Sequence, residues 1–272
     1  TSRGLGDVYK RQAVSGIGDC SFAPDEYQVT IYEMSLCTAS PTAPTSSAAF
    51  DASACSIVIN SPAGQTINMA AGSELALADF IRPPNGKYTH GHMLISNSFG
   101  IKVTKEFTNT MFQNNTSNTG KFCWTLGGTE DSSDFSDASP PSAAASPSAF
   151  ANCGAEGAAA PAMYTERLDE FDSSGASQFK YGPVTVQSGA ITAFLVTAAT
   201  SRLVTADNTA DRLFGIQSFT TPIVVKPDSS SFTISFGVNQ ATQMQMDDKG
   251  VTDQYKVIAF GSGPFSSFMT VE

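Results

Sequence analysis

Apolar and polar residues alternate with a period of two along most of the chain. The clearest cases are the segments 99–104, 121–126 and 232–238, in which every second residue is large and apolar. Strict alternation is typical of strands with one buried face and one solvated face, as in antiparallel sheets. In the second segment, this parity places Trp124 in the core and Cys123 on the solvated face.

The alternation changes parity within the segment 27–36. Apolar side chains occupy odd positions from Tyr27 to Ile31 and even positions from Tyr32 to Leu36. Because a shift by one residue turns every side chain to the other face, this change predicts a β-bulge, or a strand that bends from one sheet to another.

The remaining strand candidates are short and separated by turn residues. They are 56–60, 65–69, 87–96, 178–187, 190–198, 201–205, 213–219, 222–226, 255–261 and 266–271. Helical signals are confined to two short segments, where Ser73 and Thr165 would cap residues 74–80 and 166–171. This pattern predicts an all-β fold, an antiparallel β-sandwich of the jelly-roll or immunoglobulin-like kind, with long low-complexity loops and a few short helical turns.

Two segments stand outside the strand pattern. Residues 131–161 are rich in Ser, Ala, Pro and Gly, which predicts a mobile loop or a linker. Neither half of the chain carries a complete set of strands, so we expect a single β-sandwich domain over 13–272.

Residues 2–12 read as translated sequencing adapter, as expected of metagenomic DNA. We therefore exclude residues 1–12 from the fold as a disordered artefact and expect that a signal peptide lay upstream of Ala13.

The chain is acidic and sparsely charged. Its 272 residues carry a net charge of −10, and only 15% of them are charged. An acidic surface repels phosphate backbones, which disfavours nucleic-acid binding. No stretch approaches the ~20 apolar residues of a transmembrane helix. The composition favours an extracellular, cell-surface or periplasmic β-protein.

The five cysteines lack the spacing of a zinc site. Cys37 ends one predicted strand and Cys55 begins another, so a disulfide between them would stabilise the fold by about 3 kcal/mol. Cys123 and Cys153 bracket a second loop and form a second predicted pair. Cys20 belongs to neither predicted disulfide. The alternative is that all five are reduced core cysteines, because the compartment is inferred only from composition.

Several landmarks occur in a fixed order along the chain. They are the segment 27–38, Cys55, the strand start Gly86-Lys-Tyr-Thr-His90, Phe122-Cys-Trp-Thr125, the segment 232–239 and a terminal strand begun by Pro264. In this order they resemble a group of secreted β-sandwich proteins of unknown function from marine bacteria, whose members usually carry a bulkier residue at the position of Gly91. The resemblance implies an exported β-sandwich and brings no catalytic residues.

His90 and His92 are the most suggestive candidates for metal chemistry. Residues i and i+2 of a strand point to the same side, so two imidazoles could share one ion. The sequence names no third ligand, and we expect both histidines to be part of a strand without a stoichiometric transition metal.

Asp247, Asp248 and Asp253 resemble a calcium-binding loop. They lack the alternating ligand spacing and the terminal Glu of an EF-hand, and a hairpin turn explains them equally well. No Gly-x-Ser-x-Gly elbow and no phosphate-binding loop is present in the sequence. We therefore expect no catalytic residues and no cofactor, calcium remaining an alternative.

Three functions remain open. The first is an exported structural or adhesive protein without catalytic activity, whose partners would be a surface polymer or further copies of the chain. The second is a carbohydrate- or ligand-binding module, which would need exposed aromatic residues. The third is a hydrolase that uses a carboxylate pair, although nothing in the sequence selects one.

Overall fold

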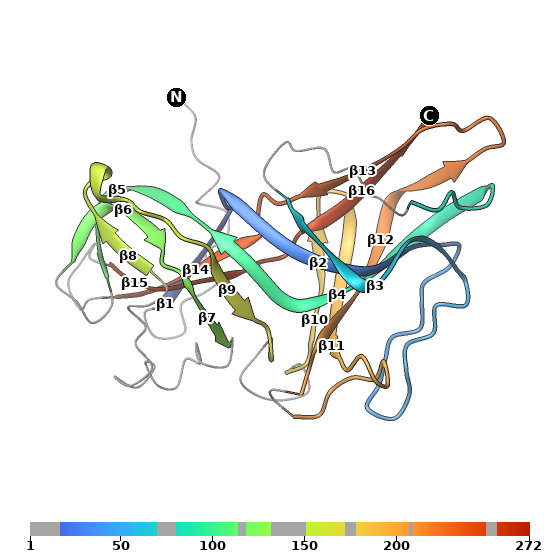
Figure 1. Ribbon diagram of the computed structural model, residues 1–272, viewed down its shortest axis with the longest axis horizontal. Coiled ribbons are helices and arrows are strands. Elements are labelled where there is room, and N and C mark those ends of the chain that lie inside the picture. Colours follow the sequence, from blue (N-terminus) through green and yellow to red (C-terminus); the bar gives the residue numbers. More distant parts are fainter. Residues whose placement is uncertain are drawn as a thin grey trace.

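A computed structural model describes residues 17–69, 80–113, 118–131, 151–171, 178–206, 209–248 and 255–272. Apart from one 3₁₀ turn, η4 (Glu156–Ala158), the regular elements in these ranges are all strands. The structure confirms the all-β prediction, because these strands form several mainly antiparallel sheets in a sandwich-like arrangement (Figure 1).

The larger sheet has eight strands. Six follow the order β10-β11-β12-β4-β2-β3, and β9 pairs with both β4 and β7. Their bounds are β2 (Glu26–Cys37), β3 (Cys55–Asn68), β4 (Gly86–Lys102), β7 (Gly128–Asp131), β9 (Tyr164–Arg167), β10 (Lys180–Val186), β11 (Gly189–Val196) and β12 (Arg212–Val225).

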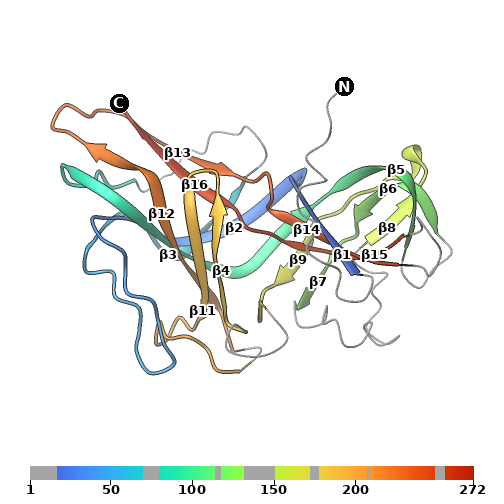
Figure 2. The ribbon, with the colours of Figure 1, turned by 180° about the vertical axis from the view of Figure 1, so that it is seen from behind.

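The second sheet has six strands in the order β1-β14-β15-β5-β6-β8, and β13 and β16 form a separate pair. In the view from behind, β1, β14 and β15 lie side by side (Figure 2). The bounds are β1 (Ile17–Phe22), β5 (Thr104–Gln113), β6 (Thr119–Thr125), β8 (Ala151–Gly154), β13 (Phe232–Gly237), β14 (Thr242–Asp248), β15 (Tyr255–Ser262) and β16 (Ser266–Val271). Two pairings are parallel, β15 with β5 and β7 with β9.

The predicted irregularity in the first long strand is present. The register of β2 against both β3 and β4 shifts between Ile31 and Glu33. Tyr27 and Ile31 are buried before the shift, and Met34 and Leu36 are buried after it. The bulge thus lets one strand keep apolar side chains inside after its parity has changed.

Strand β4 connects the two large sheets. It is one strand of 17 residues rather than the two predicted segments, and after Val103 the chain continues directly into β5 of the six-stranded sheet. Figure 1 shows β4 running from the end of the molecule that holds β12 toward the end that holds β5 and β6.

The main core contains side chains from both large sheets and from the β13–β16 pair, including Ile31, Ile101, Ile234 and Phe260. A second, smaller cluster is formed by Phe194, Val196 and Phe214 with partly buried neighbours. Its strands, β11 and β12, belong to the eight-stranded sheet.

Several local predictions were wrong. Residues 164–167 form strand β9 instead of the helix predicted after Thr165, because their backbone pairs with β4 and β7. Of the predicted strand 201–205, only isolated bridges at Arg202 and Leu203 form. The predicted loop 131–161 contains β8 at residues 151–154, which pairs with β6, whereas residues 132–150 lie outside the described residues. The other predicted helix covers residues 74–80, with Ser73 as its cap. Residues 70–79 lie outside the described part of the chain, so this prediction is not tested there.

Candidate functional site

The structure contains both predicted disulfides. Cys37 and Cys55 are opposite one another on β2 and β3, with an S–S distance of 2.02 Å and a Cα–Cα distance of 3.9 Å. Cys123 and Cys153 are opposite one another on β6 and β8, with an S–S distance of 2.10 Å. Cys20 lies on β1, outside both bridges. Four of the five cysteines are therefore not reduced core residues.

The second bridge corrects one detail of the strand pattern. Cys123 is 0% exposed and belongs to the main core, although the alternation placed it on a solvated face. Its neighbour Trp124 is also buried, as predicted. Both faces of β6 are covered at this end, because the successive residues Cys123 and Trp124 point to opposite faces and both are buried.

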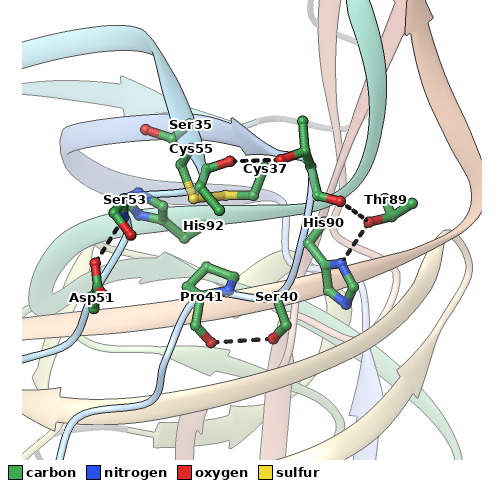
Figure 3. Close-up of a disulfide and its surroundings, with 12 residues drawn as sticks. Ser35, Cys37, Ser40, Pro41, Asp51, Ser53, Cys55, Thr89, His90 and His92 are labelled. Carbon is green, nitrogen blue, oxygen red and sulfur yellow. Dashed lines mark hydrogen bonds between the residues drawn. A yellow bond between two sulfur atoms is a disulfide. The ribbon is translucent and has the colours of Figure 1, made fainter.

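His90 and His92 both lie on β4, but their surroundings differ. His92 is buried, whereas His90 is only partly buried and its Nδ1 lies 2.9 Å from Thr89 Oγ1. Burial lowers the pKa of His90 from its ordinary value. The two rings do not point toward one another (Figure 3). The different surroundings and directions of the two imidazoles disfavour the binding of one metal ion by both rings.

The nearest charged group to the His92 ring is the carboxylate of Glu33 on β2. His92 Nε2 lies 3.2 Å from Glu33 Oε1, and the Ser35 hydroxyl donates to the same oxygen at 3.3 Å. Neither nitrogen of the His92 ring makes a hydrogen bond of ordinary geometry within the part of the chain that the structure describes. The His92 contact is the main cause that lowers the pKa of Glu33 from its ordinary value.

Glu33 is not among the residues predicted from the sequence. A signal was present, since Glu33 is the only charged residue in the segment 27–36 and sits where the parity changes. The bulge between Ile31 and Glu33 turns this carboxylate toward β4. Nothing in the local sequence, however, says that residue 92 lies on the neighbouring strand.

This cluster does not have the order of a nucleophilic triad. In a catalytic arrangement the imidazole stands between the hydroxyl and the carboxylate and takes the hydroxyl proton. Here the carboxylate of Glu33 stands between Ser35 and His92. Within the part of the chain that the structure describes, no group of three or more His, Cys, Asp or Glu residues is placed to hold a metal ion.

The loop closed by the Cys37–Cys55 disulfide covers His92. Phe50 from this loop stacks on Phe214 of β12 with ring centroids 4.0 Å apart, and the His92 ring lies 5.3 Å from Phe214 and 6.0 Å from Phe50. Figure 3 shows the disulfide beside His92, with the loop residues Asp51 and Ser53 nearby. The loop therefore completes the smaller apolar cluster and shields the His92 ring from solvent.

A second group of buried ionisable residues lies on β9 and directly after it. Glu166 is 4% exposed, and Asp169 is fully buried. The backbone N–H of Ser262 donates to Glu166 Oε2. Burial is the largest cause that raises the pKa of Glu166 to about 7, and the negative charge of Asp169 acts in the same direction. Burial, with the charge of Glu166, raises the pKa of Tyr27 well above its ordinary range.

The sequence analysis also missed these carboxyls, because it assigned residues 166–171 to a helix. Catalytic carboxylates of glycosidases must reach a sugar in a cleft. Glu166 and Asp169 lie instead in the interior between strands. Their arrangement favours a structural role.

The calcium hypothesis remains a prediction. Asp247 and Asp248 lie on β14, opposite Lys256 and Tyr255 on β15. Asp253 lies outside the described residues.

The described surface shows no aromatic platform for a sugar. Its large exposed hydrophobic residues are Ile57, Ile81, Val224 and Tyr255, of which only the last is aromatic. No helix among the described residues has the length and apolar character to cross a bilayer. Comparison of the chain with protein-family models, curated proteins and solved structures finds no match.

Proposed function

We propose that the chain is an exported structural or adhesive protein of the cell surface or extracellular space, without catalytic activity. The observation that carries this proposal is the pair of disulfides, each of which joins two paired strands. Disulfides persist in oxidising compartments and are rare in the cytosol. The resemblance of segments such as 27–38 to secreted marine bacterial proteins supports the same proposal.

The disulfide-closed loop adds a second argument. Residues 38–54 are held at both ends by Cys37–Cys55 and, within the loop, by the stacking of Phe50 on Phe214. Such a loop keeps one conformation without a bound ligand, which suits a protein that must persist outside the cell. The cluster of Ser35, Glu33 and His92 offers no nucleophile, because its hydroxyl donates to the carboxylate.

Two experiments test the proposal. The protein is produced once with an export signal and once in a reducing cytosol, and the disulfides are mapped by mass spectrometry under non-reducing conditions. We expect both bridges, and a thermally more stable product, only after export. Full stability of the reduced, cytosolic product would contradict the export proposal.

The adhesive role is tested with the exported protein. Sedimentation across a range of concentrations reports self-association, and co-sedimentation with isolated cell envelopes reports binding to a surface polymer. We expect at least one of the two. A protein that remains monomeric and stays in the supernatant would overturn the adhesive role, and hydrolysis of chromogenic glycosides that is lost in Glu166→Gln would overturn the absence of catalysis.

A further inference from the structure

Glu166 connects the two large sheets through a single side chain. Its strand, β9, belongs to the eight-stranded sheet, where Glu166 is opposite Phe99 of β4. Its carboxyl group accepts a hydrogen bond from the backbone of Ser262, the last residue of β15 in the six-stranded sheet. A Cβ atom at Gly261 would lie 3.1 Å from Glu166 Oε1, so the carboxyl group lies directly over this backbone.

Among the ionisable groups around Glu166, Asp169 disfavours its negative charge. Asp169 is fully buried and raises the pKa of Glu166 through its own charge. From β2, Tyr27 contributes a buried phenol whose hydroxyl has no hydrogen-bond partner among the described residues. From β15, the contacting residues Gly261 and Ser262 carry no ionisable side chain.

The hydroxyl and the backbone N–H of Ser262 both favour the charged form of Glu166. These two donors do not compensate for burial together with a second carboxylate, because the pKa of Glu166 is raised despite them. The contact between Glu166 on β9 and Ser262 on β15 is therefore most stable when the carboxyl group of Glu166 is neutral. The ionised carboxylate is stable only if water molecules solvate it. Water can reach it only if β9 and the end of β15 move apart.

We propose that Glu166 is a proton-dependent latch between the two sheets, closed when its carboxyl is neutral and loosened when it is ionised. Because the pKa of Glu166 is raised to about 7, the change falls close to neutral pH. The contact between β9 and β15 is firm in mildly acidic solution and opens more often in mildly alkaline solution. This device concerns the sheet seam and does not depend on the surface role proposed above.

Hydrogen exchange of the Ser262 amide tests the latch. The exchange is measured on the whole protein between pH 5 and 9, and each rate is divided by the intrinsic rate at that pH. We expect the protection of Ser262 to fall by up to roughly tenfold per pH unit between pH 5 and about 7, and to stay constant at higher pH, once Glu166 is ionised in the closed contact as well. In Glu166→Gln, a neutral side chain that keeps an acceptor oxygen, the protection should be independent of pH.

Two further variants make the result decisive. Glu26→Gln is the matched control, because Glu26 is a strand glutamate that pairs with Lys102 at the surface, and it should leave the Ser262 profile unchanged. Asp169→Asn removes the like charge and should move the loss of protection to lower pH. A Ser262 profile that is the same in wild type, Glu166→Gln and Asp169→Asn would overturn the proposal, and a profile that responds to Glu26→Gln would do so as well.

Discussion

The side-chain amide of Gln217 forms hydrogen bonds with both backbone groups of Ser267. Gln217 Oε1 accepts from the Ser267 N–H at 3.1 Å, and Gln217 Nε2 donates to the Ser267 carbonyl at 2.9 Å. The side chain thus takes the place of a neighbouring strand and joins β12 to β16. Both residues are buried, so water does not replace these bonds, and the Ser188 hydroxyl is a second donor to the Ser267 carbonyl, at 3.3 Å.

Replacement of Gln217 by Leu should therefore be costly. The variant keeps the approximate size of the side chain but leaves the buried N–H of Ser267 without its partner and the Ser267 carbonyl with only the 3.3 Å bond from the Ser188 hydroxyl. We expect a loss of about 1 to 3 kcal/mol in the free energy of unfolding. Urea denaturation measures this loss. Gln187→Leu, at an exposed position, is the matched control and should change stability little. Equal stability of the two variants would show that the Gln217 amide does not hold β16.

The Cys37–Cys55 disulfide should contribute strongly to stability. It closes a loop with a sequence separation of 18, for which chain entropy predicts about 3 kcal/mol. The double variant Cys37→Ser, Cys55→Ser should unfold at a clearly lower temperature in scanning calorimetry. The control is Cys20→Ser, outside both bridges, from which we expect a smaller effect. A double variant as stable as this control would contradict the role given to the disulfide.

The stability of the protein should depend on Glu166 near neutral pH. Its pKa is about 7 in the folded protein and about 4.5 in the unfolded chain, so the folded state holds more protons between these values. Stability therefore falls as the pH rises from about 4.5 to about 7, by roughly 3 kcal/mol, and this contribution is constant above pH 7. Chemical denaturation of wild type and Glu166→Gln from pH 4 to 9 measures the difference. A constant difference in stability across this range would contradict the raised pKa.

The pKa of Glu33 should respond to the ring of His92. His92→Phe keeps an aromatic ring beside Phe50 and Phe214 and removes the charge contact, so the pKa of Glu33 should rise from its lowered value. In wild type, the lowered pKa contributes stability at neutral pH that is lost as the pH falls through the folded pKa. NMR titration of the Glu33 carboxyl carbon measures the change. Glu26 serves as internal reference, because its partner Lys102 is untouched.

The features that could be predicted from the sequence are those that depend on local residue patterns: most strands, the bulge in β2 and the two cysteine pairs. Alternation found most strands, and the parity change between Ile31 and Tyr32 located the bulge, because both report which side of a strand is buried. The cysteine pairs were found because each pair flanks one loop. The assignment of 166–171 to a helix failed because pairing with β4 and β7 outweighed a weak capping signal.

The candidate sites could not be predicted because each joins residues far apart in the chain. Glu33 meets His92 only through the register of β2 against β4. Glu166 meets Ser262 only because two sheets pack together. For Glu33, a charged residue within an apolar segment was the available signal, but it does not identify the partner. Glu166 lies among other charged residues and gave no such signal.

The passage of the chain from β4 into β5 determines how the two large sheets can move. Val103, the single residue between these strands, donates its N–H to Thr125 Oγ1 and accepts the N–H of Thr125, each at 3.1 Å. Both backbone groups at the crossing are thus fixed by one residue of β6. Rotation about Val103 would break two buried hydrogen bonds at once, so this crossing is a rigid joint rather than a hinge. A force applied to one sheet is therefore transmitted to the other through the covalent backbone, because β4 and β5 are joined without a flexible linker.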